Sequence, residues 1–249
     1  MTIAEAFGRA SRYHETARVQ RVVAAELAER LARRVRTPRP RVLELGCGSG
    51  FLSQSLLQNW PEGSFLITDV AAPMVERCRQ NLTCSRQNRQ FVVMDCEDHA
   101  LRPGYDLITA SLAFQWLQDF PKTLRGLLDL LAPGGILGFS TLALGTFMEW
   151  QQACARHGVP AGTPDYPPVE FFQHFWPVEG QCEIETEWYF DSYTSGISFL
   201  RHLKQIGAHS PKENYASVTA GQLRRVLRDL TTTFTIRYHV VYSFLQKDF

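Results

Sequence analysis

The sequence predicts an α/β protein with a doubly wound, seven-stranded, mostly parallel sheet. Three observations favour this class: β-rich runs alternate with amphipathic segments from residue 41 onward, a triple-glycine turn follows the first run, and an acid follows each of the next two. Strand–helix alternation builds a parallel sheet covered on both faces, and right-handed crossovers leave it open. With 249 residues, 45% of them hydrophobic, the chain has material for a large core, so disorder is excluded.

The first half of the chain follows this rhythm closely. Arg41–Leu45 is predicted to be a buried strand, followed by the glycine turn and a helix to about Leu57. Pro73 and Pro121 mark the starts of two further helices, because proline is favoured in the first helical turn. Those helices are expected over residues 73–82 and 121–131, and further strands over residues 64–68, 90–94, 105–110 and 136–141.

The rhythm changes after residue 142. Helices are expected over residues 145–157, 195–206 and 219–231, and strands over residues 182–193 and 234–245. We expect the last strand to be antiparallel and to form an edge of the sheet. The chain is interpreted as one domain with four parts: an N-terminal helical segment (1–40), a cofactor-binding core (41–142), cap insertions with the sixth strand (143–233) and the final strand (234–249).

Charge is unevenly distributed although the net charge is only +1. Residues 1–41 carry ten Arg against four Glu, residues 42–199 eight basic against eighteen acidic residues, and residues 200–249 eight basic against three acidic residues. Both ends are therefore basic around an acidic middle. Two interpretations stay open: a solvated helical face, or a docking surface for an acidic partner.

Other classes are excluded by what the sequence lacks. No run reaches the roughly 18 apolar residues that a membrane span requires, and the N-terminus has no apolar signal-peptide core. The six cysteines are scattered, with no paired spacing. This usage predicts free thiols in a cytoplasmic protein and no metal site.

The glycine turn after the first strand is the most informative segment. It reads E-x-G-x-G-x-G, with Glu44 two residues before Gly46, Gly48 and Gly50. Ligands of open α/β sheets bind at the carboxyl ends of the strands, so this turn should border a pocket. A dinucleotide fingerprint would place its third glycine at position 51, which is Phe51. A carboxylate at position 44 is unfavourable beside a pyrophosphate but suits S-adenosylmethionine, which carries an ammonium and a sulfonium group.

Two further acids follow the next two strands. Asp69 ends the second strand, where its carboxylate can accept hydrogen bonds from both ribose hydroxyls. Asp95 follows the third strand, where it can accept from an adenine amino group while the N–H of Cys96 faces a ring nitrogen. Each acid alone is weak evidence, because Asp often caps a turn. Together with the glycine turn they predict an S-adenosylmethionine site.

With these motifs, residues 40–142 resemble the class I S-adenosylmethionine-dependent methyltransferases. The likeness extends to the segments Asp106–Ser111 and Leu131–Gly135. It implies that Ser111 and Leu112 lie beside the methionine part of the cofactor. It also implies that the methionyl end is held by Glu44, Gly46, Cys47, Gly48 and Gly50, the ribose by Asp69, and the adenine by Asp95 and Cys96.

The flanking segments resemble one family, the malonyl-[acyl-carrier protein] O-methyltransferases of biotin synthesis. The likeness is carried by Tyr13 with the A-R-V-Q segment at 17–20, by S-L-A-F-Q-W at 111–116 and by residues 200–208. It implies methylation of the free carboxylate of a malonyl group on acyl carrier protein. Such a carboxylate is already ionised and needs no general base, so alignment and exclusion of water are the main requirements.

Four residues are candidates for the acceptor end of the site. Arg201, His202 and Lys204 are expected to orient the acceptor carboxylate, since two of them lie three apart on a predicted helix. Tyr13 can close over the sulfonium with its ring face. Packing or solvation is the alternative for each. If the carrier protein is acidic, as the resemblance implies, the docking residues are expected to be Arg18, Arg21, Arg201, Arg224, Arg225 and Arg228.

Three alternatives remain at this stage. The chain can be a methyltransferase for another small carboxylic acid, such as trans-aconitate, or a non-catalytic cofactor-binding regulator. An NAD-dependent dehydrogenase is opposed by Phe51 and Glu44.

Overall fold

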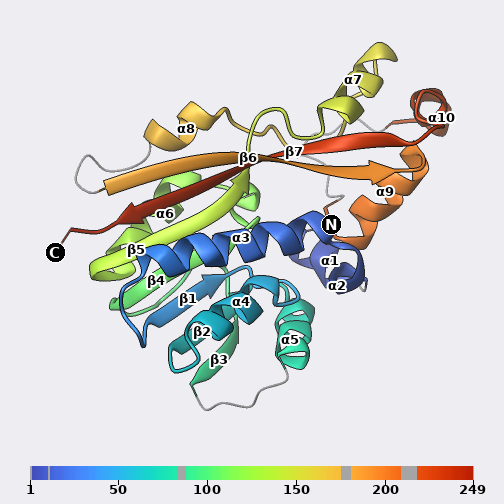
Figure 1. Cartoon of the computed structure of the whole chain (residues 1–249). Coiled ribbons are helices and arrows are strands. Elements are labelled where there is room, and N and C mark those ends of the chain that lie inside the picture. Colours follow the sequence, from blue (N-terminus) through green and yellow to red (C-terminus); the bar gives the residue numbers. More distant parts are fainter. Residues whose placement is uncertain (1, 11, 83–87, 175–180, 209–217, 249) are drawn as a thin grey trace.

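The computed structural model describes residues 2–10, 12–82, 88–174, 181–208 and 218–248. Its centre is a seven-stranded sheet in the order β3-β2-β1-β4-β5-β7-β6 (Figure 1). Neighbouring strands from β3 to β5 pair in parallel, and β7 pairs antiparallel with both β5 and β6. The predicted fold class is confirmed. The strands are β1 (Arg41–Leu45), β2 (Ser64–Asp69), β3 (Arg89–Val93), β4 (Tyr105–Ser111), β5 (Leu131–Leu142), β6 (Gln181–Tyr193) and β7 (Phe234–Gln246).

The order of the last two strands differs from the expectation. The final strand is antiparallel, as predicted, but it lies inside the sheet, and β6 forms the edge. The two strands pair along their whole length, from Gln181–Gln246 to Tyr193–Phe234. Every residue over 240–245 is buried, a pattern typical of a strand covered on both faces, whereas β6 has many exposed side chains.

Strand β5 begins at Leu131, five residues before the expected start. The pairing of this early part with β4 is irregular, because Tyr105 pairs with Leu131 whereas Leu107 pairs with Ile136. The N–H of Gly134 donates to the carbonyl of Lys247 at 3.1 Å, and the N–H of Lys247 donates to the carbonyl of Gly135 at 2.9 Å.

Helices cover both faces of the sheet. Helices α3 (Arg18–Arg34), α4 (Phe51–Asn59) and α5 (Ala72–Asn81) share one hydrophobic core with one sheet face, and α6 (Phe120–Leu130) packs against the opposite face. The remaining helices are α1 (Ile3–Gly8), α2 (Tyr13–Thr16), the short 3-10 helix η1 (Phe114–Trp116), α7 (Met148–Arg156), α8 (Val169–His174), α9 (Gly196–Gln205) and α10 (Ala220–Arg228). In Figure 1, α7, α9 and α10 gather at one end of the β6–β7 pair.

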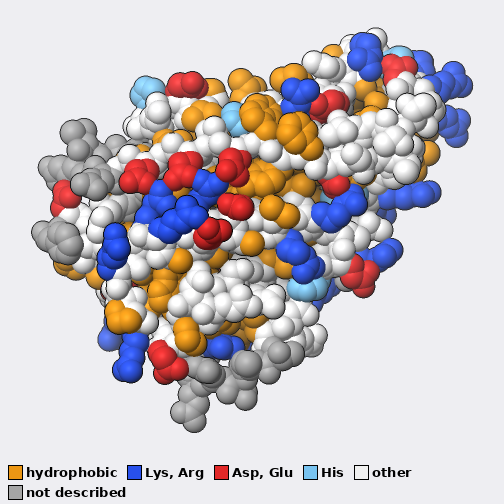
Figure 2. Space-filling view, viewed as in Figure 1, with side chains coloured by type: hydrophobic (Ala, Val, Ile, Leu, Met, Phe, Trp, Pro, Cys, Tyr) orange, Lys and Arg blue, Asp and Glu red, His pale blue; other side chains and the backbone are white. Residues whose placement is uncertain are grey.

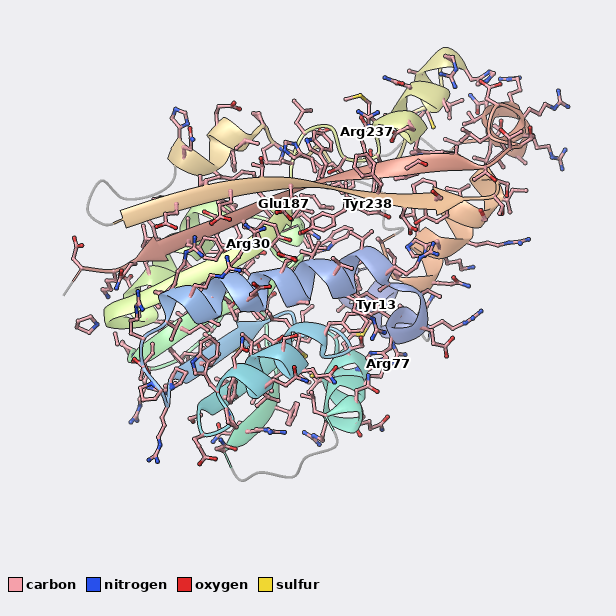
Figure 3. All side chains as sticks on the ribbon, viewed as in Figure 1. Tyr13, Arg30, Arg77, Glu187, Arg237 and Tyr238 are labelled. Carbon is pink, nitrogen blue, oxygen red and sulfur yellow. The ribbon has the colours of Figure 1, made fainter. Side chains whose placement is uncertain are left out.

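The basic N-terminal segment is partly neutralised inside the molecule. Arg30 on α3 donates to Glu185 and, at 2.6 Å, to Glu187, and its guanidinium lies 4.3 Å from the ring centroid of Tyr242. Arg34 makes the same kind of contacts one turn later, with Glu183, Glu185 and Phe244. Figure 2 shows the resulting band of Arg and Glu side chains, and Figure 3 shows Arg30 directed toward Glu187. These ion pairs hold α3 against β6.

Candidate functional site

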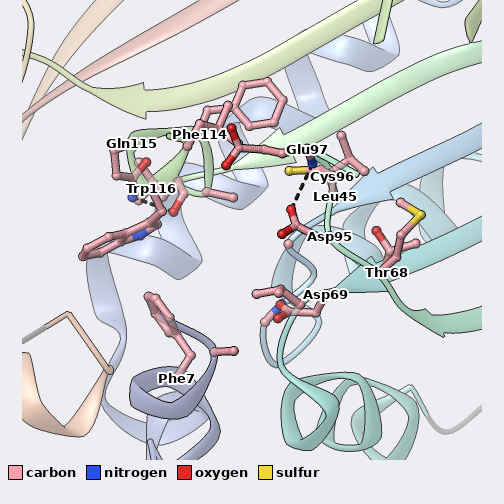
Figure 4. A pocket seen from close by; sticks show the side chains of 18 of the residues that line it. Phe7, Leu45, Thr68, Asp69, Asp95, Cys96, Glu97, Phe114, Gln115 and Trp116 are labelled. Carbon is pink, nitrogen blue, oxygen red and sulfur yellow. Dashed lines mark hydrogen bonds between the residues drawn. The ribbon is translucent and has the colours of Figure 1, made fainter. Parts of the chain in front are cut away.

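A cavity of about 720 Å³ lies at the carboxyl ends of the central strands (Figure 4). Its walls come from the ends of β1 and β2, the loops after β3 and β4, the N-terminal helices α1 and α2, and Pro164. The structure therefore assembles segments that are far apart in the chain. Eight residues predicted for the site line it: Tyr13, Gly46, Gly48, Asp69, Asp95, Cys96, Ser111 and Leu112.

The glycine turn is held close to both neighbouring strands. Gly46 has φ +67°, and a Cβ there would lie 2.7 Å from the Cβ of Ala113, so only glycine fits. The N–H of Cys47 donates to the carbonyl of Thr68 at 2.8 Å, and the N–H of Gly48 donates to Oδ2 of Asp69 at 2.9 Å. The turn thus presents a fixed backbone to the cavity.

Glu44 is buried behind this turn and is only 1% exposed. No ion pair and no hydrogen bond of regular geometry reaches either carboxylate oxygen among the residues that the structure describes, although the hydroxyl and N–H of Ser53 lie close by. Burial raises the pKa of Glu44 to about 8, and nearby Ser53 opposes this shift only in part. A buried carboxylate without a cationic partner is costly, so this acid suits a cation bound nearby. The cavity lining does not include three residues predicted for the site: Glu44, Cys47 and Gly50.

Asp69 joins the end of β2 to the glycine turn. Its Oδ1 accepts from the N–H of Ala71 at 2.8 Å and its Oδ2 from Gly48. Burial raises its pKa, and these two bonds offset part of the rise. Each carboxylate oxygen can accept a second hydrogen bond, so the side chain keeps acceptor capacity toward the cavity.

The loop after β3 contributes Asp95, Cys96 and an acid that was not predicted. Oδ1 of Asp95 accepts from the N–H of Glu97 at 2.9 Å, the bond dashed in Figure 4. The Glu97 carboxylate in turn accepts from the N–H groups of Gln118 and Asp119, each at 2.9 Å. Glu97 thereby fixes this loop to the start of α6.

Leu112 follows β4 with φ +47°, a conformation that side chains other than glycine rarely adopt. Its N–H donates to the carbonyl of Ser140 at 3.0 Å, and the Ser140 hydroxyl donates to Ser111 Oγ at 3.2 Å. Backbone strain of this kind is concentrated at functional sites. The strained backbone at Leu112 therefore supports the interpretation of this cavity wall as part of a functional site.

The N-terminal helices form one wall of the cavity. Tyr13 on α2 was expected to close over the site, whereas the contribution of α1 was not predicted. The ring of Tyr13 lies over Gly48, where a Cβ would be 3.6 Å from Tyr13 Cε1, and stacks on Phe51 at 6.1 Å. Burial raises the pKa of Tyr13, so it stays a neutral phenol. Arg77 on α5 anchors this wall by donating to the carbonyls of Ala10 at 2.8 Å and Gly8 at 3.1 Å (Figure 3).

Several wall residues were missed or given no role. A capping box formed by Thr2 and Glu5 marks the start of α1, and this was the available signal for that helix. Nothing in the sequence indicated that Pro164 reaches the cavity. Among the missed residues are Thr2, Ala4, Phe7, Glu97, Gln118 and Pro164, and Gln115 was noted only as part of a motif.

Three of the predicted acceptor residues lie elsewhere. Arg201 and Lys204 are exposed on α9. His202 is buried with its ring 5.4 Å from that of Tyr193, and burial lowers its pKa, so it stays neutral. The cause is the packing of α9, whose apolar side faces β6 and turns the basic side chains to solvent. The structure does not bring these three residues into the cavity.

The predicted docking residues fall into two groups. Arg18 pairs with Asp191 at 2.7 Å, and Arg21 donates to the carbonyl of His14 at 2.7 Å. The other group lies exposed on α9 and α10 and forms no ion pair within the described part of the chain; it consists of Arg201, Arg224, Arg225 and Arg228.

The described residues include neither a membrane-spanning helix nor a cluster of metal-binding side chains. None of the helices found there is long and apolar enough to cross a membrane. Within the same ranges, no three His, Cys, Asp or Glu side chains are grouped so that they could hold a metal ion.

The strand order, the glycine turn and the acids at the strand ends define a class I methyltransferase. A family model described as a methyltransferase domain matches residues 43–137. The chain belongs to the malonyl-[acyl-carrier protein] O-methyltransferase family. It is 47% identical over 246 residues to a protein of that name from Magnetococcus marinus, which covers 98% of this chain and 91% of the relative.

A second relative is longer. The biotin biosynthesis bifunctional protein BioCD of Bordetella avium is 39% identical over 220 residues, or 88% of this chain, and this chain spans 46% of its length.

Solved structures share the fold at low identity. A methyltransferase of Bacillus halodurans C-125 has a TM-score of 0.65 at 10% identity, covering 90% of this chain and 99% of that one. The N-methyltransferase NodS of Bradyrhizobium japonicum, in complex with S-adenosylhomocysteine, has a TM-score of 0.51 at 14% identity, covering 89% and 86%. These likenesses show the fold alone.

Proposed function

We propose that this protein transfers the methyl group of S-adenosylmethionine to the free carboxylate of malonyl-acyl carrier protein, an early step of biotin synthesis. The names of the two relatives support the acceptor and the pathway. The observation that carries the proposal is the cavity itself, where a glycine turn and acids from successive strand ends meet.

The residues present fit this cofactor. The buried carboxylate of Glu44 behind the glycine turn has no cationic partner among the described residues and suits the ammonium group of the methionyl end. Asp69 has acceptor capacity left for ribose hydroxyls, and Asp95 with Cys96 lines the adjoining wall, where we place the adenine. Ser111 and Leu112 then border the methionine part. When bound, the cofactor supplies an electrophilic methyl group on a positively charged sulfur.

The chain's own contribution is alignment and exclusion of water. The acceptor carboxylate is ionised at neutral pH and requires no general base. The rings of Phe7 and Trp116 meet edge to face, with centroids 5.5 Å apart, and form an apolar wall beside the cavity. Tyr13 presents its ring above the glycine turn, where it can favour a cation by about 0.5–2 kcal/mol. Orientation alone contributes roughly 7–11 kcal/mol in such reactions.

We further infer that the carrier protein docks on the exposed arginines of α9 and α10. Arg224, Arg225 and Arg228 share one exposed region with no acidic partner among the described residues. Arg18 and Arg21 are also exposed but contribute less, because each is already bound to a partner within the chain, Asp191 and the carbonyl of His14. The five described cysteines are free thiols, which supports a reducing, cytoplasmic setting.

The direct test is the intact mass of malonyl-acyl carrier protein after incubation with enzyme and S-adenosylmethionine. A gain of one methylene unit, located on the malonyl carboxylate, supports the proposal. Methylation of free diacids such as trans-aconitate, with none on the carrier-bound malonyl group, favours another small acid as acceptor. Cofactor binding without transfer to any acid favours a regulator.

A further inference from the structure

The cavity lacks a basic side chain where a carboxylate substrate would be expected to need one. Within the described part of the chain, its lining includes Asp69, Asp95 and Glu97 but no Lys or Arg. All three acids accept hydrogen bonds from backbone N–H groups of the protein. An acceptor carboxylate in this cavity therefore has no lysine or arginine of the described lining to pair with, and only neutral N–H and O–H groups are left to donate to it.

The chemistry of the proposed reaction explains why neutral donors suffice. A lone pair of the acceptor oxygen forms a bond to the methyl carbon while the carbon–sulfur bond breaks, and that bond's electron pair stays on sulfur. The carboxylate loses its negative charge and the sulfonium its positive charge. A fixed cation would thus stabilise the substrate more than the transition state and slow the reaction. A neutral N–H can orient the carboxylate with a smaller penalty.

Gln115 has the geometry for this task. Its Nε2 donates to the carbonyl of Leu112 at 2.6 Å, and its Oε1 accepts from the Thr141 hydroxyl at 3.3 Å. These two bonds fix the plane of the amide. The amide nitrogen carries two hydrogens, and the second N–H has no acceptor among the described residues, on a side chain that lines the cavity.

We propose that Gln115 binds and orients the acceptor carboxylate: its second amide N–H donates to one carboxylate oxygen and leaves the other free to attack. This inference rests on the proposed function. Gln115 follows the strained residue Leu112 in the chain and lies beside Trp116, so its anchor belongs to the same rigid wall (Figure 4).

The test compares Gln115→Glu with Gln58→Glu, which makes the same change at an exposed residue of α4 outside the cavity lining. Two quantities are measured: kcat/KM for malonyl-acyl carrier protein, and its Kd in the dead-end complex with S-adenosylhomocysteine. For Gln115→Glu we expect both to worsen about 100-fold, since a donor to a charged group becomes a repelling acceptor. For Gln58→Glu we expect no more than about a 5-fold loss.

Two further measurements separate the possible failures. The Kd for S-adenosylhomocysteine alone should stay within about 3-fold in both variants, and Gln115→Met, which is neutral and similar in size, should lose about 10-fold in acceptor affinity. Equal effects of the two Glu variants, or a parallel loss of S-adenosylhomocysteine affinity in Gln115→Glu, would overturn this inference. Failure of the wild type to methylate the carrier-bound malonyl group would instead overturn the proposed function.

Discussion

Oδ2 of Asp69 accepts a hydrogen bond of 2.9 Å from the backbone N–H of Gly48. The acid that ends β2 therefore also fixes the glycine turn that follows β1. The same side chain that we expect to bind the ribose thus also holds the backbone of the glycine turn in place. A change at Asp69 should affect both at once.

Replacing Asp69 with Asn tests this link. The amide cannot accept from both Gly48 and Ala71, because its nitrogen is a donor. We expect the Kd for S-adenosylhomocysteine to rise about 10- to 100-fold and the free energy of unfolding to fall by about 1–2 kcal/mol. Calorimetry and urea unfolding check the two effects. Unchanged cofactor affinity would show that Asp69 serves only the turn.

Replacing Glu44 with Gln should change how stability depends on pH. Burial raises the pKa of Glu44 from 4.5 to about 8, so between these values the folded protein binds more protons than the unfolded chain. The stability of the wild type should therefore fall as pH rises through this range, and Glu44→Gln should escape that loss. The free energy of unfolding of the variant, relative to that of the wild type, should rise by at most about 1.4 kcal/mol per pH unit. Urea unfolding of the unliganded proteins between these two pKa values tests this. A pH-independent difference would contradict it.

Replacing Arg77 with Leu should loosen the N-terminal helices. The side chain donates to two carbonyls at the end of α1, and these helices include Tyr13 above the glycine turn. We expect S-adenosylhomocysteine to dissociate about 5- to 30-fold faster, as expected when hydrogen bonds from a charged group are lost. Stopped-flow displacement measures this rate. Arg79→Leu is the matched control, because Arg79 lies on the same helix in an exposed pair with Glu76. If both variants released S-adenosylhomocysteine at the same rate, Arg77 would have no specific role in anchoring the N-terminal helices.

Replacing Arg30 with Met should lower stability without changing cofactor binding. The Arg30 side chain is 12% exposed and joins α3 to Glu185 and Glu187, far along the sheet from the cavity. We expect a loss of about 1–3 kcal/mol in the free energy of unfolding, mainly because acidic partners are left unpaired. Arg33→Met, an exposed residue of the same helix, should cost less than about 0.5 kcal/mol. A shift in S-adenosylhomocysteine affinity would show that the two regions are coupled.

Reversing charge on α10 tests the docking surface. The triple variant Arg224→Glu, Arg225→Glu and Arg228→Glu should raise the KM for malonyl-acyl carrier protein about 10-fold or more at low salt, and the difference should shrink at high salt. Its affinity for S-adenosylhomocysteine should stay unchanged. The control reverses three exposed arginines that precede the amino ends of the central strands β1 and β4, Arg36, Arg39 and Arg102. Equal KM values for the two triple variants would place the carrier elsewhere.

The parts of the site at the strand ends were accessible to sequence reasoning. Parallel neighbours bring their carboxyl ends to one edge, so Asp69 and the glycine turn had to meet once β1 and β2 were identified. The buried run over 240–245 carried the signal for an interior last strand. The prediction of an edge strand was wrong because both faces of this run are largely apolar, as expected for a strand inside a sheet.

Other parts depend on packing that spacing does not determine. Arg201 and Lys204 share a helix side as their spacing predicts, but only the tertiary structure shows that Phe199 and Leu203 take the buried side of α9. Helix α1 has six residues, too few for a periodic pattern, so its position over the cavity could not be predicted.

A crystal structure with S-adenosylhomocysteine tests the central claim most directly. The account predicts the ligand in the cavity at the carboxyl ends of β1, β2 and β4, with its ribose hydroxyls on Asp69, its adenine beside Asp95 and its sulfur facing Tyr13. A ligand bound away from the glycine turn, or none at saturating concentration, would contradict the account.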